Sequence, residues 1–231
     1  MKKKLLMGTG ILLSIGMGFA HADYQYDNLW TMNLEGGYGE TLTPSTNMNT
    51  AGGSHSTKGL MYSTGLGYSW AFQKGLFGGV EADYLNNGIV QYKGSGGSSD
   101  TGTLNINGSA YAALINITYF VGENWNWFVK VGYAYVQNVN DYSGPLSVDG
   151  SGGNRYTMSN DYSIHAWQPM GVFGVGYAFA LSDGTGLNLY SDITWINGQS
   201  ESNFGYINAN NDESNQTAEV LAAKVGLQLF F

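Results

Sequence analysis

Ser163, His165 and Asp161 stand two residues apart along one stretch of the chain. In an extended strand, residues two apart lie on the same face, so these three side chains share one face if the stretch is a strand. A serine nucleophile, a histidine base and a carboxylate that orients the histidine are the groups used in acyl transfer and ester hydrolysis. A hydrolase or acyltransferase site is therefore one hypothesis. His55-Ser56 is a second pair, but its neighbours predict a solvated loop.

Two other segments carry oxygen atoms that could bind a cation. They are Asp149-Gly150-Ser151-Gly152-Gly153-Asn154 and Asn210-Asn211-Asp212-Glu213. Carboxylate and amide oxygens suit calcium, but neither segment has the ligand spacing of an EF-hand loop. The same residue types are those of ordinary turns. We expect no metal site and no cofactor.

Six further charged residues lie in segments where polar and apolar residues alternate: Glu35, Glu81, Asp83, Lys130, Asp192 and Lys224. Alternation with period two predicts strands with one apolar and one polar face. The same polar faces carry many glycines, such as Gly65, Gly79 and Gly226. The charged side chains are therefore expected on the inner side of a sheet whose outer side is apolar, and buried charges need partners.

The alternation predicts eight strands, over residues 28–40, 58–72, 75–92, 107–121, 126–140, 163–180, 186–199 and 215–231. Short turns alternate with longer connections over about 41–57, 93–106, 141–162 and 200–214, which are rich in Gly, Ser, Asn, Asp and Thr. Tyr, Trp and Phe residues gather near both ends of the strands, as aromatic belts do at membrane interfaces. Pro169 lacks the ladder donor and predicts a bulge or break in the sixth strand.

Together these features predict an all-β fold, an eight-stranded antiparallel up-and-down transmembrane barrel in which the last strand closes against the first. Closure places Lys224 between Glu35 and Asp192. The expected partner of Lys130 is Glu81 or Asp83. We interpret these six residues as a structural polar core in a filled lumen. An ion path is the alternative, because carboxylates outnumber ammonium groups there.

The two ends of the chain suggest export and insertion. Three lysines, a short apolar run and Ala20-His21-Ala22 predict a signal peptide over residues 1–22, cleaved before Asp23. Residues 23–231 are then the barrel. Lys224, Gly226, Leu229 and Phe231 match the C-terminal signal by which outer-membrane barrels are recognised for insertion. Because short turns of such barrels face the periplasm and long connections face outward, both termini are expected on the periplasmic side.

In its signal peptide, eight strands, four long connections, inward charge cluster and terminal Phe231, the chain resembles the OmpA/opacity-type outer-membrane barrels. The peptidoglycan-binding domain found in some members is absent from the sequence. The resemblance implies a surface antigen, an adhesin or host-interaction protein, or a protein that stabilises the envelope. Some eight-stranded barrels modify lipid A, but those deacylases carry His-x-Ser, the reverse of the order at Ser163 and His165.

We therefore predict a non-enzymatic surface protein of the Gram-negative outer membrane that acts through its four outer connections. The alternatives are a narrow cation channel of low conductance and a lipid A-modifying enzyme. Expected partners are membrane lipid and lipopolysaccharide, the barrel-assembly machinery during insertion, and host surface molecules. The net charge of −8 argues against nucleic acid, and we expect a monomer. Candidate contact residues are Tyr142, Tyr156, Tyr162, Phe204 and Tyr206.

Overall fold

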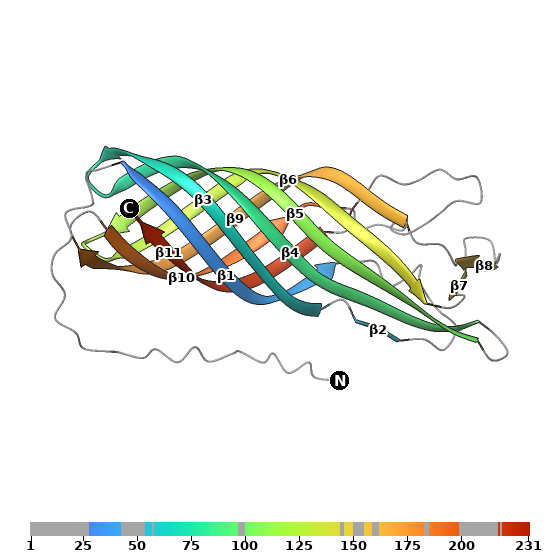
Figure 1. Ribbon diagram of the computed structural model, residues 1–231. Helices are drawn as coiled ribbons and strands as arrows, with labels where there is room; N and C mark the ends of the chain where they lie inside the picture. Colours follow the sequence, from blue (N-terminus) through green and yellow to red (C-terminus); the bar gives the residue numbers. More distant parts are fainter. Residues whose placement is uncertain are drawn as a thin grey trace, which may run out of the picture.

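Eight long strands dominate the computed structural model, which describes residues 28–42, 54–56, 58–96, 100–143, 146–149, 155–158, 162–182, 185–198, 217 and 219–231. The long strands are β1 (Leu29–Leu42), β3 (Lys58–Gln73), β4 (Leu76–Gly96), β5 (Asp100–Val121), β6 (Trp125–Ser143), β9 (Tyr162–Ser182), β10 (Thr185–Ile196) and β11 (Glu219–Phe230) (Figure 1). The short strand β2 (Ser54–Ser56) pairs with the outer part of β4, and β7 (Leu146–Asp149) pairs with β8 (Arg155–Met158) in a separate hairpin (Figure 1).

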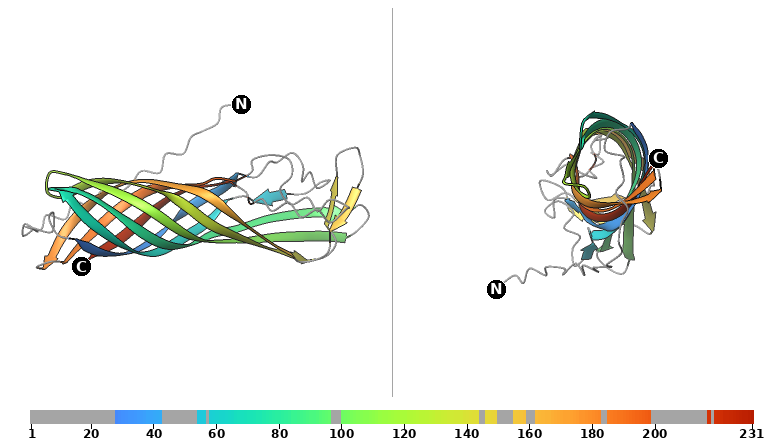
Figure 2. Two further views of the ribbon diagram at one scale, coloured as in Figure 1. Left: turned by 90° about the horizontal axis from the view of Figure 1, so that it is seen from above. Right: turned by 90° about the vertical axis from the view of Figure 1, so that its left-hand side faces the viewer.

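The long strands form a closed barrel. Each pairs antiparallel with its neighbours in the order β1, β3, β4, β5, β6, β9, β10, β11, and β11 pairs back with β1 from Thr31↔Phe230 to Leu42↔Glu219. The end view in Figure 2 shows the ring of strands. The fold is therefore the eight-stranded antiparallel up-and-down barrel expected from the sequence. No described segment is a helix with the length and apolar character needed to cross a membrane.

Burial alternates along the strands as the period-two pattern predicts. In β10, Tyr190, Asp192 and Thr194 are buried, while Leu189 and Ile193 are exposed. The same alternation in β11 buries Ala222 and Lys224 and exposes Val225 and Leu227. The barrel therefore has a polar and small-residue inside and an apolar outside, the reverse of a water-soluble protein.

Short turns lie at one end of the barrel, which we call the turn end. The β3–β4 turn passes through Gly75 and the β5–β6 turn through Gly122, both at φ 75°, a backbone conformation that glycine adopts without strain. The C-terminus lies at this same end (Figure 1). The opposite end, which we call the rim, carries the longer connections.

Two expected connections contain more strand than the sequence suggested. Within 93–106, β4 continues to Gly96 and β5 begins at Asp100, and these two residues are paired, so the prediction of a loop there is wrong in extent. Within 141–162, β6 reaches Ser143, and β7 and β8 form a small hairpin. Backbone ladder bonds do not require apolar side chains, so the Gly/Ser/Thr composition concealed the strands. The β4–β5 hairpin extends well past the closed part of the barrel (Figure 1).

A bulge in β4 interrupts the alternation where the hairpin leaves the barrel. The pairing of β4 with β5 shifts between Asn86↔Ser109 and Gly88↔Gly108. Gly88 has φ 78°, and its N–H donates to Asn86 Oδ1 at 3.0 Å. A bulge adds one residue to a strand, so the inward positions change from odd to even numbers beyond Asn87.

The predicted bulge at Pro169 is wrong. β9 pairs with β6 without a register shift from Asn140↔Tyr162 to Trp125↔Tyr177, and Pro169 lies opposite Tyr133. The carbonyl of Pro169 accepts a hydrogen bond from the Asn197 N–H at 2.8 Å, which places it on the side of β10. The nitrogen and the carbonyl of one strand residue point to the same side, so the Pro169 nitrogen also faces β10. Because β10 ends at Ile196, the N–H that Pro169 lacks would lie at the end of the pairing between β9 and β10, where few hydrogen bonds are lost.

Candidate functional site

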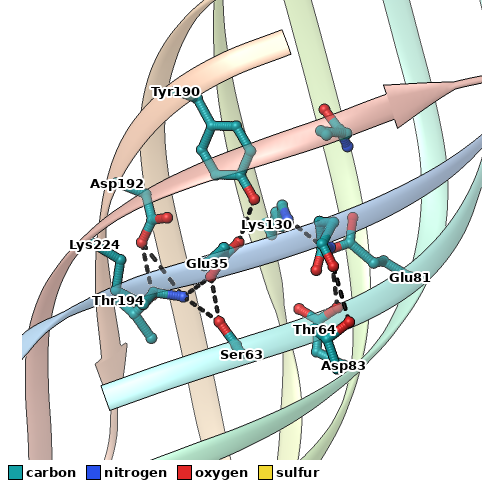
Figure 3. Close-up of polar contacts among 12 residues, drawn as sticks. Glu35, Ser63, Thr64, Glu81, Asp83, Lys130, Tyr190, Asp192, Thr194 and Lys224 are labelled. Atoms are coloured by element: carbon teal, nitrogen blue, oxygen red, sulfur yellow. Dashed lines mark hydrogen bonds and ion pairs between the residues drawn. The ribbon is translucent and has the colours of Figure 1, made fainter. Parts of the chain in front are cut away.

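Lys224 holds the first of two charged groups in the lumen (Figure 3). Its ammonium group pairs with Glu35 and lies 3.6 Å from Asp192 Oδ1, and all three side chains are buried. β11 lies between β1 and β10, so the order of strands brings these residues together. This is the arrangement that barrel closure implied.

Hydroxyl groups complete the surroundings of this ion pair. Ser63 donates to Glu35, and Tyr190 donates to Glu35 Oε1 at 2.6 Å. Thr194 donates to Asp192 Oδ1 at 2.9 Å. Buried carboxylates need this combination of a cation and hydrogen-bond donors, because neither alone replaces the lost water.

Lys130 holds the second group. Its Nζ lies 2.5 Å from Glu81 Oε1 and 5.3 Å from the centre of the Phe128 ring. Asn33 bridges Glu81 and Asp83, donating from Nδ2 at 2.7 and 3.3 Å. Of the two partners considered for Lys130, Glu81 forms the ion pair, while Asp83 is connected through Asn33.

Ser63, Tyr190 and Thr194 were not among the residues singled out from the sequence. The alternation of side chains along a strand does place each of them on an inward face. Ser63 is two residues from Gly65, and Tyr190 and Thr194 are each two residues from Asp192, so they share the faces of those residues. Aromatic and small hydroxyl residues are common on either face of a barrel strand. Composition therefore gave no reason to select them, and only the cross-strand register shows that they contact Glu35 and Asp192.

Apolar layers cover the charged groups on both sides. Toward the turn end, Leu29, Phe77, Phe120, Ala178 and Phe230 pack together, with the Phe77 and Phe120 rings 5.8 Å apart. Toward the rim, the buried set includes Met61, Leu85, Val136, Met170, Ile196 and Val220. The charged groups are therefore enclosed between two apolar layers.

One internal cavity of the barrel is small. A cavity of about 20 Å³ lies between Lys130 and the apolar layer of the turn end, and Thr31, Glu81 and Asn116 contribute to its lining. This is about the volume of one water molecule. An eight-stranded barrel is expected to be filled by its own side chains in this way.

The charges of the lumen do not balance. Within the described residues, it buries four carboxylates, of Glu35, Glu81, Asp83 and Asp192, against the two ammonium groups of Lys130 and Lys224. Glu81 Oε2 and Asp192 Oδ2 are buried without a hydrogen-bond partner. This excess of acid is the feature that keeps cation conduction as a second hypothesis.

The outer surface carries two bands of aromatic rings. Near the rim, Tyr62, Tyr84 and Tyr111 are successive neighbours at 6.4 and 5.3 Å, and Tyr135 and Trp167 follow at 5.3 Å. Near the turn end the rings belong to Trp30, Tyr68, Trp70, Tyr119, Trp125, Trp127, Tyr177 and Phe179. Between the bands the outward residues are mostly aliphatic, such as Ile115, which is 62% exposed.

The spacing of the bands matches a membrane. Tyr62 and Trp70 are eight residues apart, as are Tyr111 and Tyr119. Eight residues of strand span about 26 Å, or about 20 Å across the membrane at a tilt near 40°. The apolar band of an outer-membrane barrel is about 25 Å tall. The outer surface is therefore that of a transmembrane barrel.

The hydrolase hypothesis rests on residues near the rim. Ser163 and His165 both point outward from β9 and are exposed, and the His165 ring lies 6.0 Å from that of Tyr135. In the described part of the chain, no side-chain hydrogen bond joins Ser163 to His165. Asp161 lies outside the described residues. Among the described residues, no group of three or more acidic, histidine or cysteine side chains is placed so that it could hold a metal ion.

The remaining predicted residues are placed as follows. Lys224, Gly226 and Leu229 belong to β11, with Lys224 and Gly226 inward, and the exposed Phe231 follows its end. Tyr142, Tyr156 and Tyr162 belong to β6, β8 and β9, but the structure does not describe their side chains. Phe204 and Tyr206 lie outside the described residues.

No protein-family model and no curated protein matches the chain. Solved structures to which it is similar are neisserial surface protein A (13% identity, TM-score 0.37, 87% of this chain and 97% of that one), Ail of Yersinia pestis (10%, 0.38, 87% and 98%) and OprG of Pseudomonas aeruginosa (13%, 0.38, 90% and 99%). Similarity at this level does not bear on function. The eight-stranded up-and-down architecture is established by the strand register itself.

Proposed function

We propose that this protein is an integral barrel of the bacterial outer membrane that acts without enzymatic activity, through the connections at its rim. The observation that carries this proposal is the closed lumen. Two buried ion-pair groups lie between two apolar layers, and the cavity between Lys130 and the layer at the turn end holds about 20 Å³. A barrel filled in this way presents to an external partner only the segments beyond its rim, and binding residues are commonly carried by loops on a rigid scaffold.

The proposal includes an orientation. The turn end, with both ends of the barrel domain, faces the periplasm, and the rim faces outward, because outer-membrane barrels have short periplasmic turns and longer outer loops. Lys224, Gly226, Leu229 and Phe231 then serve as the insertion signal read by the assembly machinery. Residues 1–22 serve as the export signal. Lipid and lipopolysaccharide surround the barrel, and host surface molecules are the proposed external partners.

Removing the outer connection between β6 and β9 tests the proposed contact surface. Deletion of 143–160 leaves Asp141, Tyr142 and Asp161 between the paired residues Asn140 and Tyr162, which is enough for a hairpin loop. We expect the variant to fold and insert, because the whole closed part of the barrel remains. Adhesion of cells displaying it to host cells should fall to the level of cells lacking the protein.

A second deletion, of residues 201–214, serves as the comparison, because it shortens a different connection and removes Phe204 and Tyr206. Heat-modified mobility on gels reports folding of both variants. Loss of adhesion with the second deletion alone would assign the contact to that connection. Adhesion retained by both would reject these two connections as the contact surface.

A narrow cation channel is the second candidate, supported by the two excess carboxylates of the lumen. We expect the folded protein to give no current steps in a planar bilayer, because the apolar layers around Phe77 and Val136 block the axis. Reproducible cation-selective steps that disappear in the Glu81→Gln/Asp83→Asn variant would instead establish conduction and overturn the closed-lumen proposal.

A further inference from the structure

A row of aromatic residues crosses four strands at the rim side of the apolar band. Tyr84 of β4 pairs with Tyr111 of β5, Tyr111 with Tyr135 of β6, and Tyr135 with Trp167 of β9. All four side chains are on the outside of the barrel. Aromatic rings of this kind lie at the level where acyl chains meet headgroups. These rings therefore belong to the outer interfacial region on this side of the barrel, and the row is inclined to the membrane plane because the strands are tilted.

The next outward-facing row is entirely polar. Asn86 pairs with Ser109, Ser109 with Gln137, and Gln137 with His165, on the same four strands and two residues closer to the rim. These residues are half-buried or exposed. On each strand, a single inward-facing residue therefore lies between the row of aromatic rings and the row of amide, hydroxyl and imidazole groups.

Amides continue above this row on the part of the sheet that extends past the barrel. Asn107 Nδ2 donates to Asp141 Oδ2 at 2.9 Å, and Gln91 Nε2 donates to Asn105 Oδ1 at 2.8 Å. Antiparallel pairing holds Gln91, Asn105 and Asp141 directly side by side. We call Asn86, Gln91, Asn105, Asn107 and Gln137 the amide strip. Gln91, Asn105 and Asn107 are ordered by these cross-strand hydrogen bonds, and Asn86 accepts from the Gly88 N–H. Each amide carries two donors and two acceptor sites, so these four side chains still have capacity for a ligand.

The charge of the amide strip restricts its partner. None of the described side chains in the polar rows is a lysine or arginine, and Asp141 adds a carboxylate. Phosphate groups are bound most strongly by such cations, so these amides favour a neutral ligand. Amides beside aromatic rings instead suit sugar hydroxyls, which offer paired donors and acceptors above an apolar ring face. The strip lies on the rim side of the aromatic row, so such sugars must be held at the membrane surface.

We propose that the amide strip binds the saccharide portion of a glycolipid of the outer leaflet, with the acyl chains of the same molecule lying against the apolar band below Tyr111 and Tyr135. The proposal rests on the membrane placement given under the proposed function. It differs from that function in its site, because the strip belongs to the strands and not to the connections. The bound glycolipid forms a shell around one side of the barrel and orders the base of the β4–β5 hairpin.

The test compares two lipids and two double variants of the full mature chain in detergent micelles. The lipids are lipopolysaccharide with its core oligosaccharide and lipid A without that core. The strip variant is Asn107→Val/Gln137→Val, and the control is Asn28→Val/Gln73→Val at the turn end, which changes the same residue types where no glycolipid sugar lies. Dissociation constants are obtained by fluorescence titration of folded protein, with folding checked by heat-modified mobility.

We expect the strip variant to bind core-bearing lipopolysaccharide about tenfold or more weakly than the unaltered chain, and lipid A equally well. The control should match the unaltered chain with both lipids. Equal weakening for both lipids would show that phosphate or acyl contacts dominate and would overturn the proposal, as would unchanged binding. Asn107→Ser/Gln137→Ser replaces the strip variant if the latter does not fold. Adhesion by the same variants separates failure of this inference from failure of the proposed function.

Discussion

Replacing Lys224 by methionine is expected to destabilise the folded barrel by about 3–5 kcal/mol. The substitution keeps the length and apolar stem of the side chain but removes the charge that faces both Glu35 and Asp192. Ser63, Tyr190 and Thr194 still donate to these carboxylates. Hydrogen bonds from neutral hydroxyls do not compensate two buried negative charges, so most of the cost remains.

The free energy of unfolding is measured by urea titration of protein refolded into lipid vesicles, followed by tryptophan fluorescence. Refolding without assembly machinery separates stability from the proposed role of Lys224 in insertion. Lys58→Met is the matched control, because Lys58 Nζ lies 3.2 Å from Glu40 on the exposed surface. An exposed pair contributes only about 0–1 kcal/mol. Equal effects of the two substitutions would contradict the buried-pair interpretation.

A double-mutant cycle with Glu35→Gln gives a finer test of the pair. The Lys224→Met/Glu35→Gln variant no longer buries the charge of Glu35, and Gln keeps the shape of that side chain. We expect it to recover about 1–3 kcal/mol relative to Lys224→Met alone. Strict additivity of the two single changes would show that Lys224 and Glu35 do not stabilise each other.

Replacing Ile115 by arginine is expected to cost about 2–4 kcal/mol, because this residue faces the middle of the bilayer. Ile115 lies on the outside of β5, four residues from Tyr111 and four from Tyr119, and it pairs with the outward residues Val80 and Val131. An arginine there has neither water nor a carboxylate within the apolar band. The same vesicle refolding assay measures the loss.

Val139→Arg provides the control for depth. Val139 is also outward and 37% exposed, but it lies four residues closer to the rim than Tyr135 and pairs with Asn107. The cost of arginine falls to about 0–1 kcal/mol near the interface. Small and equal costs at both positions would mean that the outer surface does not face lipid, and would remove the basis of the membrane assignment.

Several features of the candidate site followed from local sequence alone. Period two placed Glu35, Glu81, Asp83, Asp192 and both lysines on inward faces, because a strand turns alternate side chains to opposite sides. Closure of an even-stranded barrel then brought Lys224 between Glu35 and Asp192. The aromatic bands could also be recognised in the sequence. The alternation that places aliphatic residues on the outer face also places Tyr111 and Tyr119 there, at the two ends of the apolar band.

Other features depend on cross-strand register. The choice of Glu81 over Asp83 as partner of Lys130 depends on the level at which β4 and β6 meet across the lumen, which no single strand determines. The bulge at Asn86–Gly88 and the extension of β4 and β5 depend on ladder bonds between residues whose types are those of loops. The tolerance of Pro169 depends on where its neighbour β10 ends.

The amino-acid sequence by itself determined the membrane-spanning parts of the eight strands, their two faces and the enclosed charged core, because alternation along a strand is a local property that each residue expresses independently of its partners. Only the tertiary structure decided which buried charges form pairs, how tightly the lumen is closed and which polar residues lie next to the aromatic row on its rim side. These features require the relative shift of neighbouring strands, and that shift is set by the closure of all eight strands together.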